Sequence, residues 1–167
     1  APKGYVLSGK VHTLTVKAGQ TTGIKATDKE QLGNITIYKE CEVLVGWNGS
    51  NYTYETRKLP GATFKVTAGA DIYKADGTKV YSKGDVIAEN LVSGSDGQVV
   101  LSDLHLGTYV VTETKSIDGY TINTTPQTVK IEYKDQNVTV QAESTTIKNS
   151  RQKAEVSVVK KDSDTDN

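Results

Sequence analysis

The segment Ile35-Thr-Ile-Tyr-Lys-Glu-Cys-Glu-Val-Leu-Val45 alternates along its length, and the interpretation of the whole sequence starts from it. Successive side chains of a β-strand point to opposite faces of the sheet, so the odd-numbered residues share one face. Ile35, Ile37 and Val43 make this the face that we expect to be buried. Lys39 lies on the same face, where a lysine is rarely found without a partner.

Similar short alternating segments recur along the chain, separated by Gly, Asp and Asn. Thr and Val are the commonest residues, and β-branched side chains fit a pleated, half-buried surface. Gly46–Asn51 is interpreted as a loop. The regular spacing of strands and turns predicts an all-β sandwich. The further strands expected are Ala62–Ala68, Ile72–Tyr73, Val80–Tyr81, Val99–Leu101, Thr108–Thr114, Tyr120–Asn123, Gln127–Tyr133, Asn137–Gln141 and Thr145–Asn149.

Composition excludes several classes of function. The chain has 167 residues with 20 basic and 20 acidic side chains, so it offers no electrostatic footprint for nucleic acid or an anionic membrane. No apolar run is long enough to span a bilayer, and we expect no membrane insertion. One Cys excludes an internal disulfide, and two His leave little for a metal site. Without an initiator Met or a signal peptide, the sequence is expected to be a segment of a longer polypeptide.

The two ends of the chain carry fragments of the same pattern as the middle. Residues 28–39 align without gaps on residues 149–160, so that Asp28 matches Asn149 and Lys39 matches Lys160. This predicts a tandem array cut out of phase: the last strands of one repeat in residues 1–30, a complete repeat in 31–150, and the first strand of the next in 151–167. In the alternative, both ends belong to the central domain as extra strands.

Alternation places three polar side chains on buried faces. Lys39 lies on the first strand of the complete repeat, Glu113 on a middle strand and Asn149 on the last. Apolar surroundings favour a neutral amine and a neutral carboxylic acid, and a neutral amine is a nucleophile. Attack on the asparagine carboxamide, with the acid moving protons, would form an amide cross-link and release ammonia. A buried lysine–glutamate ion pair with an asparagine hydrogen bond and no covalent chemistry fits the same residues equally well.

Several motifs resemble those of Cna B-type domains, also called SpaA-like or prealbumin-like repeats. They are Leu59-Pro-Gly-Ala-Thr-Phe-Lys-Val66, then Asp96-Gly-Gln-Val99, then Leu104-His-Leu-Gly-Thr-Tyr-Val-Val-Thr-Glu-Thr-Lys115, followed by Gly119-Tyr120. They occur in the order typical of the family, and the resemblance covers essentially all of residues 31–150. Ala1-Pro-Lys-Gly-Tyr5 resembles the segment that follows the conserved glutamate of such a repeat. The resemblance implies an immunoglobulin-like, prealbumin-like β-sandwich flanked by partial neighbouring repeats.

The resemblance also implies the chemistry, because many members of this family form an intramolecular isopeptide bond. The matching positions are Lys39 as donor, Asn149 as acceptor and Glu113 as the catalytic acid that shuttles protons. Asp28 would be the acceptor of the preceding repeat, and Lys160 the donor of the following one. No cofactor or metal is implied.

The resemblance implies a structural stalk repeat of a secreted, Gram-positive surface adhesin or pilus-like protein, associated with the cell wall and packed against adjacent repeats of its own polypeptide. The only chemistry would be one self-cross-linking event, so the chain is not expected to be an enzyme. Two alternatives remain: a ligand-binding adhesin module for a host matrix protein or glycan, and an accessory module of an extracellular enzyme. The first would use Trp47, Tyr52 and Tyr54.

Overall fold

The computed structural model describes residues 1–160 and confirms an all-β fold, because this part of the chain contains strands and no helix. It therefore holds no helix that could cross a membrane. The strands are β1 (Tyr5–Val6), β2 (Lys29–Glu30), β3 (Leu32–Trp47), β4 (Tyr52–Lys58), β5 (Thr63–Ala68), β6 (Ile72–Tyr73), β7 (Lys79–Tyr81), β8 (Val86–Val92), β9 (Gln98–Leu104), β10 (Gly107–Lys115), β11 (Gln127–Ile131) and β12 (Val140–Asn149).

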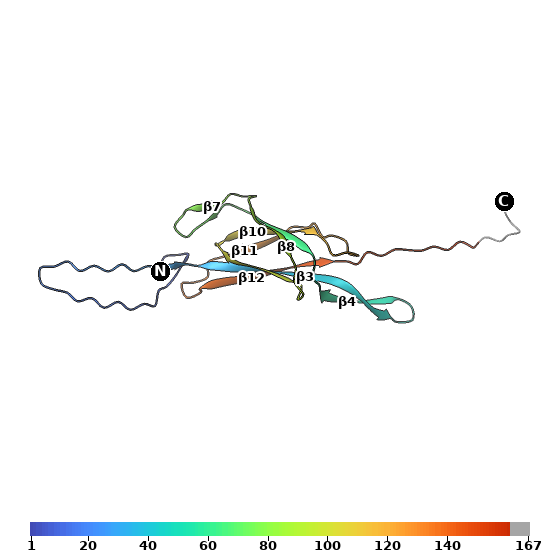
Figure 1. Ribbon diagram of the computed structural model, residues 1–167, viewed down its shortest axis with the longest axis horizontal. Coiled ribbons are helices and arrows are strands. Elements are labelled where there is room, and N and C mark those ends of the chain that lie inside the picture. Colours follow the sequence, from blue (N-terminus) through green and yellow to red (C-terminus); the bar gives the residue numbers. More distant parts are fainter. Residues whose placement is uncertain (161–167) are drawn as a thin grey trace.

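Two sheets pack face to face (Figure 1). One is antiparallel, in the order β11-β10-β5-β8. The other is built around β3, which pairs with the last strand, β12, on one edge and with β9 and then β4 on the other. The pairing of β3 with β12 is parallel, so the first and last strands of the sandwich lie side by side and run in the same direction.

The core lies between the two sheets. Every second residue is buried from Gly33 to Cys41 in β3 and from Phe64 to Ala68 in β5, as expected for strands with one face toward a core. The side chains that fill this space are Ile35, Ile37, Phe64, Val66, Ala68, Ile72, Tyr109, Val111, Val129, Ile131 and Ile147, with Val99, Leu101 and Leu104 from β9.

The first predicted strand is longer than expected, and its buried alternation is shorter. β3 continues to Trp47, so that only residues 48–51 form the loop predicted for Gly46–Asn51. Val43 is half-buried and Val45 is exposed, because this end of β3 pairs with β4 in a hairpin that extends beyond the opposite sheet (Figure 1). The expected burial of the odd-numbered face therefore ends after Cys41.

Other strand predictions were wrong in identifiable ways. Tyr120–Asn123 is not a strand and contributes one isolated bridge, from Tyr120 to Arg151. The two strands predicted within residues 137–149 are the single strand β12. β4 and β8 were not predicted at all. β4 is largely polar, while β8 loses its alternation near Asn90, which has a positive φ of 56°.

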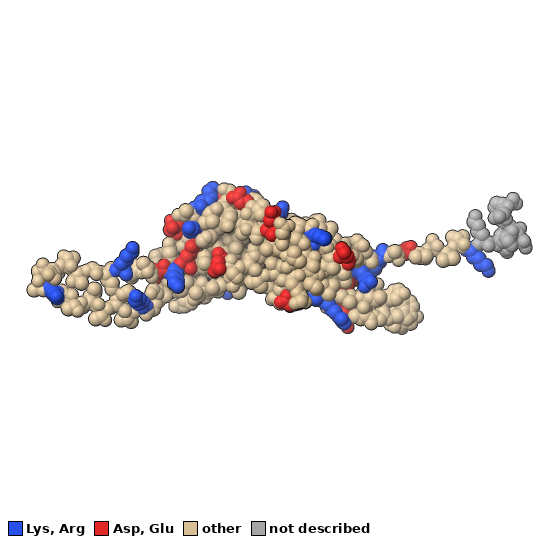
Figure 2. Space-filling view, in the orientation of Figure 1, with Lys and Arg blue, Asp and Glu red and all other residues tan. Residues whose placement is uncertain are grey.

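The two ends of the described chain extend from opposite ends of the sandwich (Figure 1). β1 and β2 form a short antiparallel pair, and residues 7–28 between them form a loop without strands that is exposed through residue 27. Residues 152–160 are extended and exposed, and residues 161–167 of the predicted following repeat lie outside the described part. The division of the chain into one complete and two partial repeats remains a prediction. On the face shown in Figure 2, basic and acidic side chains are interspersed over the sandwich.

A single methyl group at Gly33 is predicted to destabilise the sandwich. A Cβ there would lie 2.8 Å from the Gln141 carbonyl oxygen and would also collide with the side chain of Ile131. Gly33→Ala should therefore lower the free energy of unfolding by about 1–3 kcal/mol, as other overpacking substitutions do. Urea unfolding measures this change. Gly23→Ala is the control, because nothing lies within 4 Å of a Cβ at Gly23; equal stability of the two variants would contradict the packing.

Candidate functional site

The backbone on both sides of Lys39 is fixed by two loops of the sandwich. The Lys39 N–H donates to the Gly97 carbonyl at 2.8 Å, and the Lys39 carbonyl accepts from the Leu59 N–H at 3.2 Å. Gly97 has a positive φ of 67°, and a Cβ on it would lie 2.9 Å from the Leu59 nitrogen and 3.0 Å from the Lys39 oxygen. Only glycine fits this turn, which explains the Asp96-Gly97 motif in structural terms.

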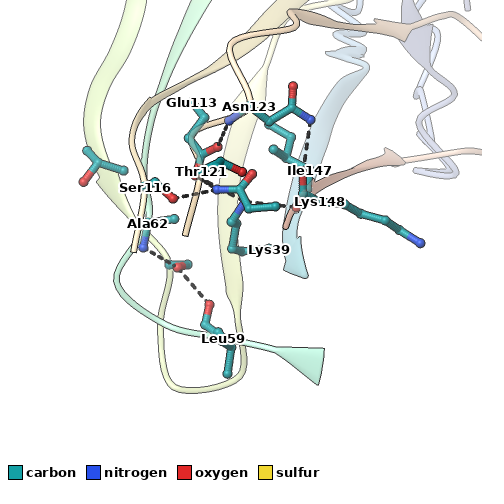
Figure 3. A network of polar contacts seen from close by, with 12 residues as sticks. Lys39, Leu59, Ala62, Glu113, Ser116, Thr121, Asn123, Ile147 and Lys148 are labelled. Atoms are coloured by element: carbon teal, nitrogen blue, oxygen red, sulfur yellow. Dashed lines mark hydrogen bonds and ion pairs between the residues drawn. The ribbon is translucent and has the colours of Figure 1, made fainter. Parts of the chain in front are cut away.

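Lys39 and Glu113, both labelled in Figure 3, come together with Asn149 between the two sheets. Their side chains come from β3, β10 and β12, and all three residues are buried. Lys39 Nζ lies 3.2 Å from Glu113 Oε1, and Asn149 Nδ2 donates to the same oxygen at 2.8 Å. The amine and the carboxamide therefore contact one carboxylate oxygen from two sides.

Three further groups complete the polar network. Lys39 Nζ also donates to the Ile147 carbonyl at 3.4 Å, on the strand that carries Asn149. Glu113 Oε2 accepts the Asn123 backbone N–H at 2.9 Å, and Ser116 Oγ accepts from Asn149 Nδ2 at 2.7 Å (Figure 3). Asn149 Oδ1 is buried and has no hydrogen-bond partner within the described residues.

Burial dominates the electrostatics of this site. It lowers the pKa of Lys39 below the ordinary lysine value, and the nearby Glu113 carboxylate opposes the shift without cancelling it. Burial also raises the pKa of Cys41, the register partner of Asn149 on β3. Burial therefore raises the share of the neutral lysine amine, the nucleophilic form, and keeps the thiol protonated.

The residues predicted for the neighbouring repeats are not brought into such a site. Asp28 Oδ1 accepts the Ser8 N–H at 3.1 Å in an exposed position. Lys160 is exposed in the extended segment at the opposite end of the chain. Their predicted partners would belong to other repeats, so both roles remain predictions.

The aromatic residues considered for ligand binding lie on the β3–β4 hairpin. Trp47 and Tyr52 contact each other edge to face, with ring centroids 4.9 Å apart, at the exposed tip. Lys153 lies over the Tyr54 ring at 4.3 Å and also pairs with Glu42 at 3.4 Å. The hairpin thus packs on itself and on the segment that follows β12. Within residues 1–160, no group of three or more His, Cys, Asp and Glu side chains could hold a metal ion.

Sequence reasoning missed two members of the network, Ser116 and Asn123. Ser116 follows the last residue of β10, and Asn123 contributes its backbone N–H from an irregular segment. Ser116 lies beyond the end of a strand and has no periodic signal, whereas Asn123 lies in a segment that alternates but forms no strand. The spacing of Ser116 three residues after Glu113 is the one feature that could have suggested proximity.

The structure is a two-sheet sandwich with a buried lysine, glutamate and asparagine. This agrees with the prealbumin-like class of domain that the sequence motifs implied. The model of the SpaA family, a prealbumin-like fold domain, matches residues 52–146, and the chain belongs to this family. The match includes Glu113, whereas Lys39 and Asn149 lie outside its bounds.

Solved structures share the fold at low sequence identity. GBS52, the minor pilin of the Gram-positive pathogen Streptococcus agalactiae, is 21% identical with a TM-score of 0.50; the match covers 80% of this chain and 51% of GBS52. The TIE protein of Bacillus anthracis is 23% identical with a TM-score of 0.56, covering 90% of this chain and 23% of that protein. The chain thus spans about half or less of each of these relatives. No curated protein matches the sequence.

Removing the carboxylate while keeping the lysine is predicted to destabilise the domain. Glu113→Ala leaves the Lys39 amine buried without its counter-charge, which costs about 3–5 kcal/mol in comparable buried pairs. The double variant Lys39→Met/Glu113→Ala has the same cavity but buries neither charge. We therefore expect the double variant to be the more stable of the two in urea unfolding at pH 7.

This difference should shrink as the pH rises. Without Glu113, burial keeps the pKa of Lys39 in the folded state below the ordinary value of 10.5 that it has in the unfolded chain. Between these two values the unfolded state binds more protons, so the free energy of unfolding of Glu113→Ala rises with pH. The double variant lacks this lysine. Equal stability of the two variants at pH 7, or a difference independent of pH, would contradict the electrostatic account.

Proposed function

We propose that the chain is a structural repeat of a bacterial surface or pilus-like protein, in which β3 and β12 become joined by an isopeptide bond between Lys39 and Asn149. Glu113 moves the protons. The reaction occurs once in each chain, so the domain is not an enzyme with an external substrate. Membership of the SpaA family and the fold shared with GBS52, a minor pilin of a Gram-positive pathogen, support an extracellular, surface-associated role.

One observation carries the proposed cross-link. The Lys39 amine and the Asn149 carboxamide contact the same buried oxygen, Glu113 Oε1, at 3.2 Å and 2.8 Å. A nucleophile and an electrophile held by three strands against the same oxygen react with a high effective concentration. The lowered pKa of Lys39 supports the presence of the neutral amine that the attack needs.

The protons and bonds of the reaction balance within the site. Lys39 transfers a proton to the Glu113 carboxylate, and the neutral amine adds to Asn149 Cγ. Glu113 then passes this proton to Nδ2, the bond from Cγ to Nδ2 breaks, and Glu113 takes the second proton from Lys39 Nζ, which leaves a neutral amide. Ammonia leaves, the amide between Lys39 Nζ and Asn149 Cγ remains, and the surplus proton stays on Glu113 or leaves with the ammonia as ammonium.

A hollow beside the site offers a route for this ammonia. It has a volume of about 170 Å³, and its lining includes Asn149, its neighbours Lys148 and Ser150, and Cys41. The released molecule could therefore leave through space that borders the residue from which it departs.

The position of the proposed bond suits a load-bearing repeat. β3 and β12 are neighbouring parallel strands. Tension would enter at the start of β3 and leave at the end of β12, so it would pull the two strands in opposite directions along their length. Pulling them apart would shear every hydrogen bond between them at once. A bond from Lys39 to Asn149 would carry the force directly past residues 40–148.

The mass of the intact chain tests the cross-link. We expect it to be lower than the mass calculated from the sequence by one ammonia, and digestion to release a branched peptide that joins Lys39 to Asn149. Lys39→Arg, Glu113→Gln and Asn149→Ala should each restore the calculated mass. Lys148→Arg is the control, because this lysine is largely exposed on β12 and should leave the loss of ammonia unchanged. A folded wild-type chain of full calculated mass would refute the proposed bond.

Pulling on the two ends of a single molecule tests the mechanical role. The wild-type chain should release no length from residues 40–148, whereas Glu113→Gln should release this length in an unfolding step. The bond closes a loop of 110 residues (149 − 39), and cross-links of about 100 residues stabilise by about 5 kcal/mol through loss of unfolded-state entropy. Release of the same length from both proteins would exclude a force-bearing cross-link.

A further inference from the structure

The unpaired oxygen of Asn149 points to a further participant in the site, and this inference rests on the proposed cross-link. Asn149 Nδ2 has two partners, Glu113 Oε1 and Ser116 Oγ, whereas Oδ1 is buried with none in the described residues. A buried carbonyl oxygen without a donor is costly and rare. The reaction also requires this oxygen to be polarised, because negative charge develops on it when the amine adds to Cγ.

The two oxygens of Glu113 have different roles, which decides where its proton is carried. Oε2 receives the Asn123 backbone N–H at 2.9 Å and so acts as an acceptor. A proton taken from Lys39 is therefore carried on Oε1, the oxygen that lies 3.2 Å from Lys39 Nζ. Oε1 then changes from an acceptor, which suits Asn149 Nδ2, to a donor, which suits Asn149 Oδ1.

We propose that the Asn149 carboxamide turns over when Glu113 is protonated, and that the Ser116 hydroxyl is a second catalytic donor to the oxyanion on Asn149 Oδ1. A half-turn of the carboxamide places Oδ1 where Nδ2 lies, within hydrogen-bond distance of both Glu113 Oε1 and Ser116 Oγ. A hydroxyl is both donor and acceptor, so Ser116 pairs with Nδ2 before the proton transfer and with Oδ1 after it. When the amine adds, Cγ becomes tetrahedral and Nδ2 moves back within reach of Glu113 Oε1, which gives it the proton with which it departs as ammonia.

The rate of ammonia loss in newly made full-length chain tests this role. The chain is produced in a short pulse of cell-free translation, and the fraction that has lost ammonia is followed by intact mass. Removing one oxyanion donor slows comparable reactions by about 100-fold or more. Ser116→Ala should show such a loss of rate, whereas Ser116→Thr, which keeps the hydroxyl, should react within a few-fold of wild type.

Two further variants separate chemistry from folding. Ser116→Cys keeps the shape of the side chain but supplies a weak donor, and it should be slow as well. Ser93→Ala removes the hydroxyl of a buried serine, which bonds to the Ala62 N–H and the Leu59 carbonyl away from the reacting atoms. It should react at the wild-type rate once folded. Circular dichroism identifies any variant that has not folded. The rate of ammonia loss is then compared for whichever of Ser116→Ala and Ser116→Cys is folded.

Each outcome has a distinct meaning. A folded Ser116→Ala or Ser116→Cys chain that reacts as fast as wild type overturns the role of Ser116 and leaves the proposed cross-link intact. Equal slowing of the Ala, Cys and Thr variants also overturns it, because the hydroxyl would then not be the active feature. A wild-type chain that never loses ammonia refutes the proposed function itself.

Discussion

The burial of one amine against one carboxylate is the constraint on which the rest of the structure depends. Lys39 belongs to one sheet of the sandwich and Glu113 to the other, and neither charge is tolerated alone in an apolar interior. The two sheets must therefore meet in a single alignment at this point. β12 then supplies Asn149 as the third side chain of the site. The segment after β10 adds the Ser116 hydroxyl and the Asn123 backbone N–H.

The three central residues were predictable from the sequence because strand periodicity is a strong signal where one face is buried. Lys39 follows Ile35 and Ile37 at the same parity, Glu113 follows Tyr109 and Val111, and Asn149 follows Ile147. All lie in segments whose apolar neighbours fix the buried face. The motifs around them identified the family, and the family match agrees.

Elements without such a face could not be predicted in this way. β4 pairs with the projecting end of β3 outside the core, so its side chains show no apolar alternation. Tyr120–Asn123 alternates, but its backbone bonds to Ser150 and to the Glu113 side chain instead of a neighbouring strand. Ser116 and Asn123 act from irregular segments, where position in space follows from the completed fold and not from a local period.

The register of β12 against β3 has a consequence for how the protein reaches its final state. Ile147 pairs with Lys39 and Asn149 with Cys41, and a slip of one residue would turn Asn149 to the outer face of the sheet. Lys39 would then meet no carboxamide. Because the loss of ammonia is irreversible in practice, the proposed reaction would permanently fix only those chains in which β12 has the correct register. Misaligned chains would stay free to unfold and search again, and only correctly assembled ones would be sealed.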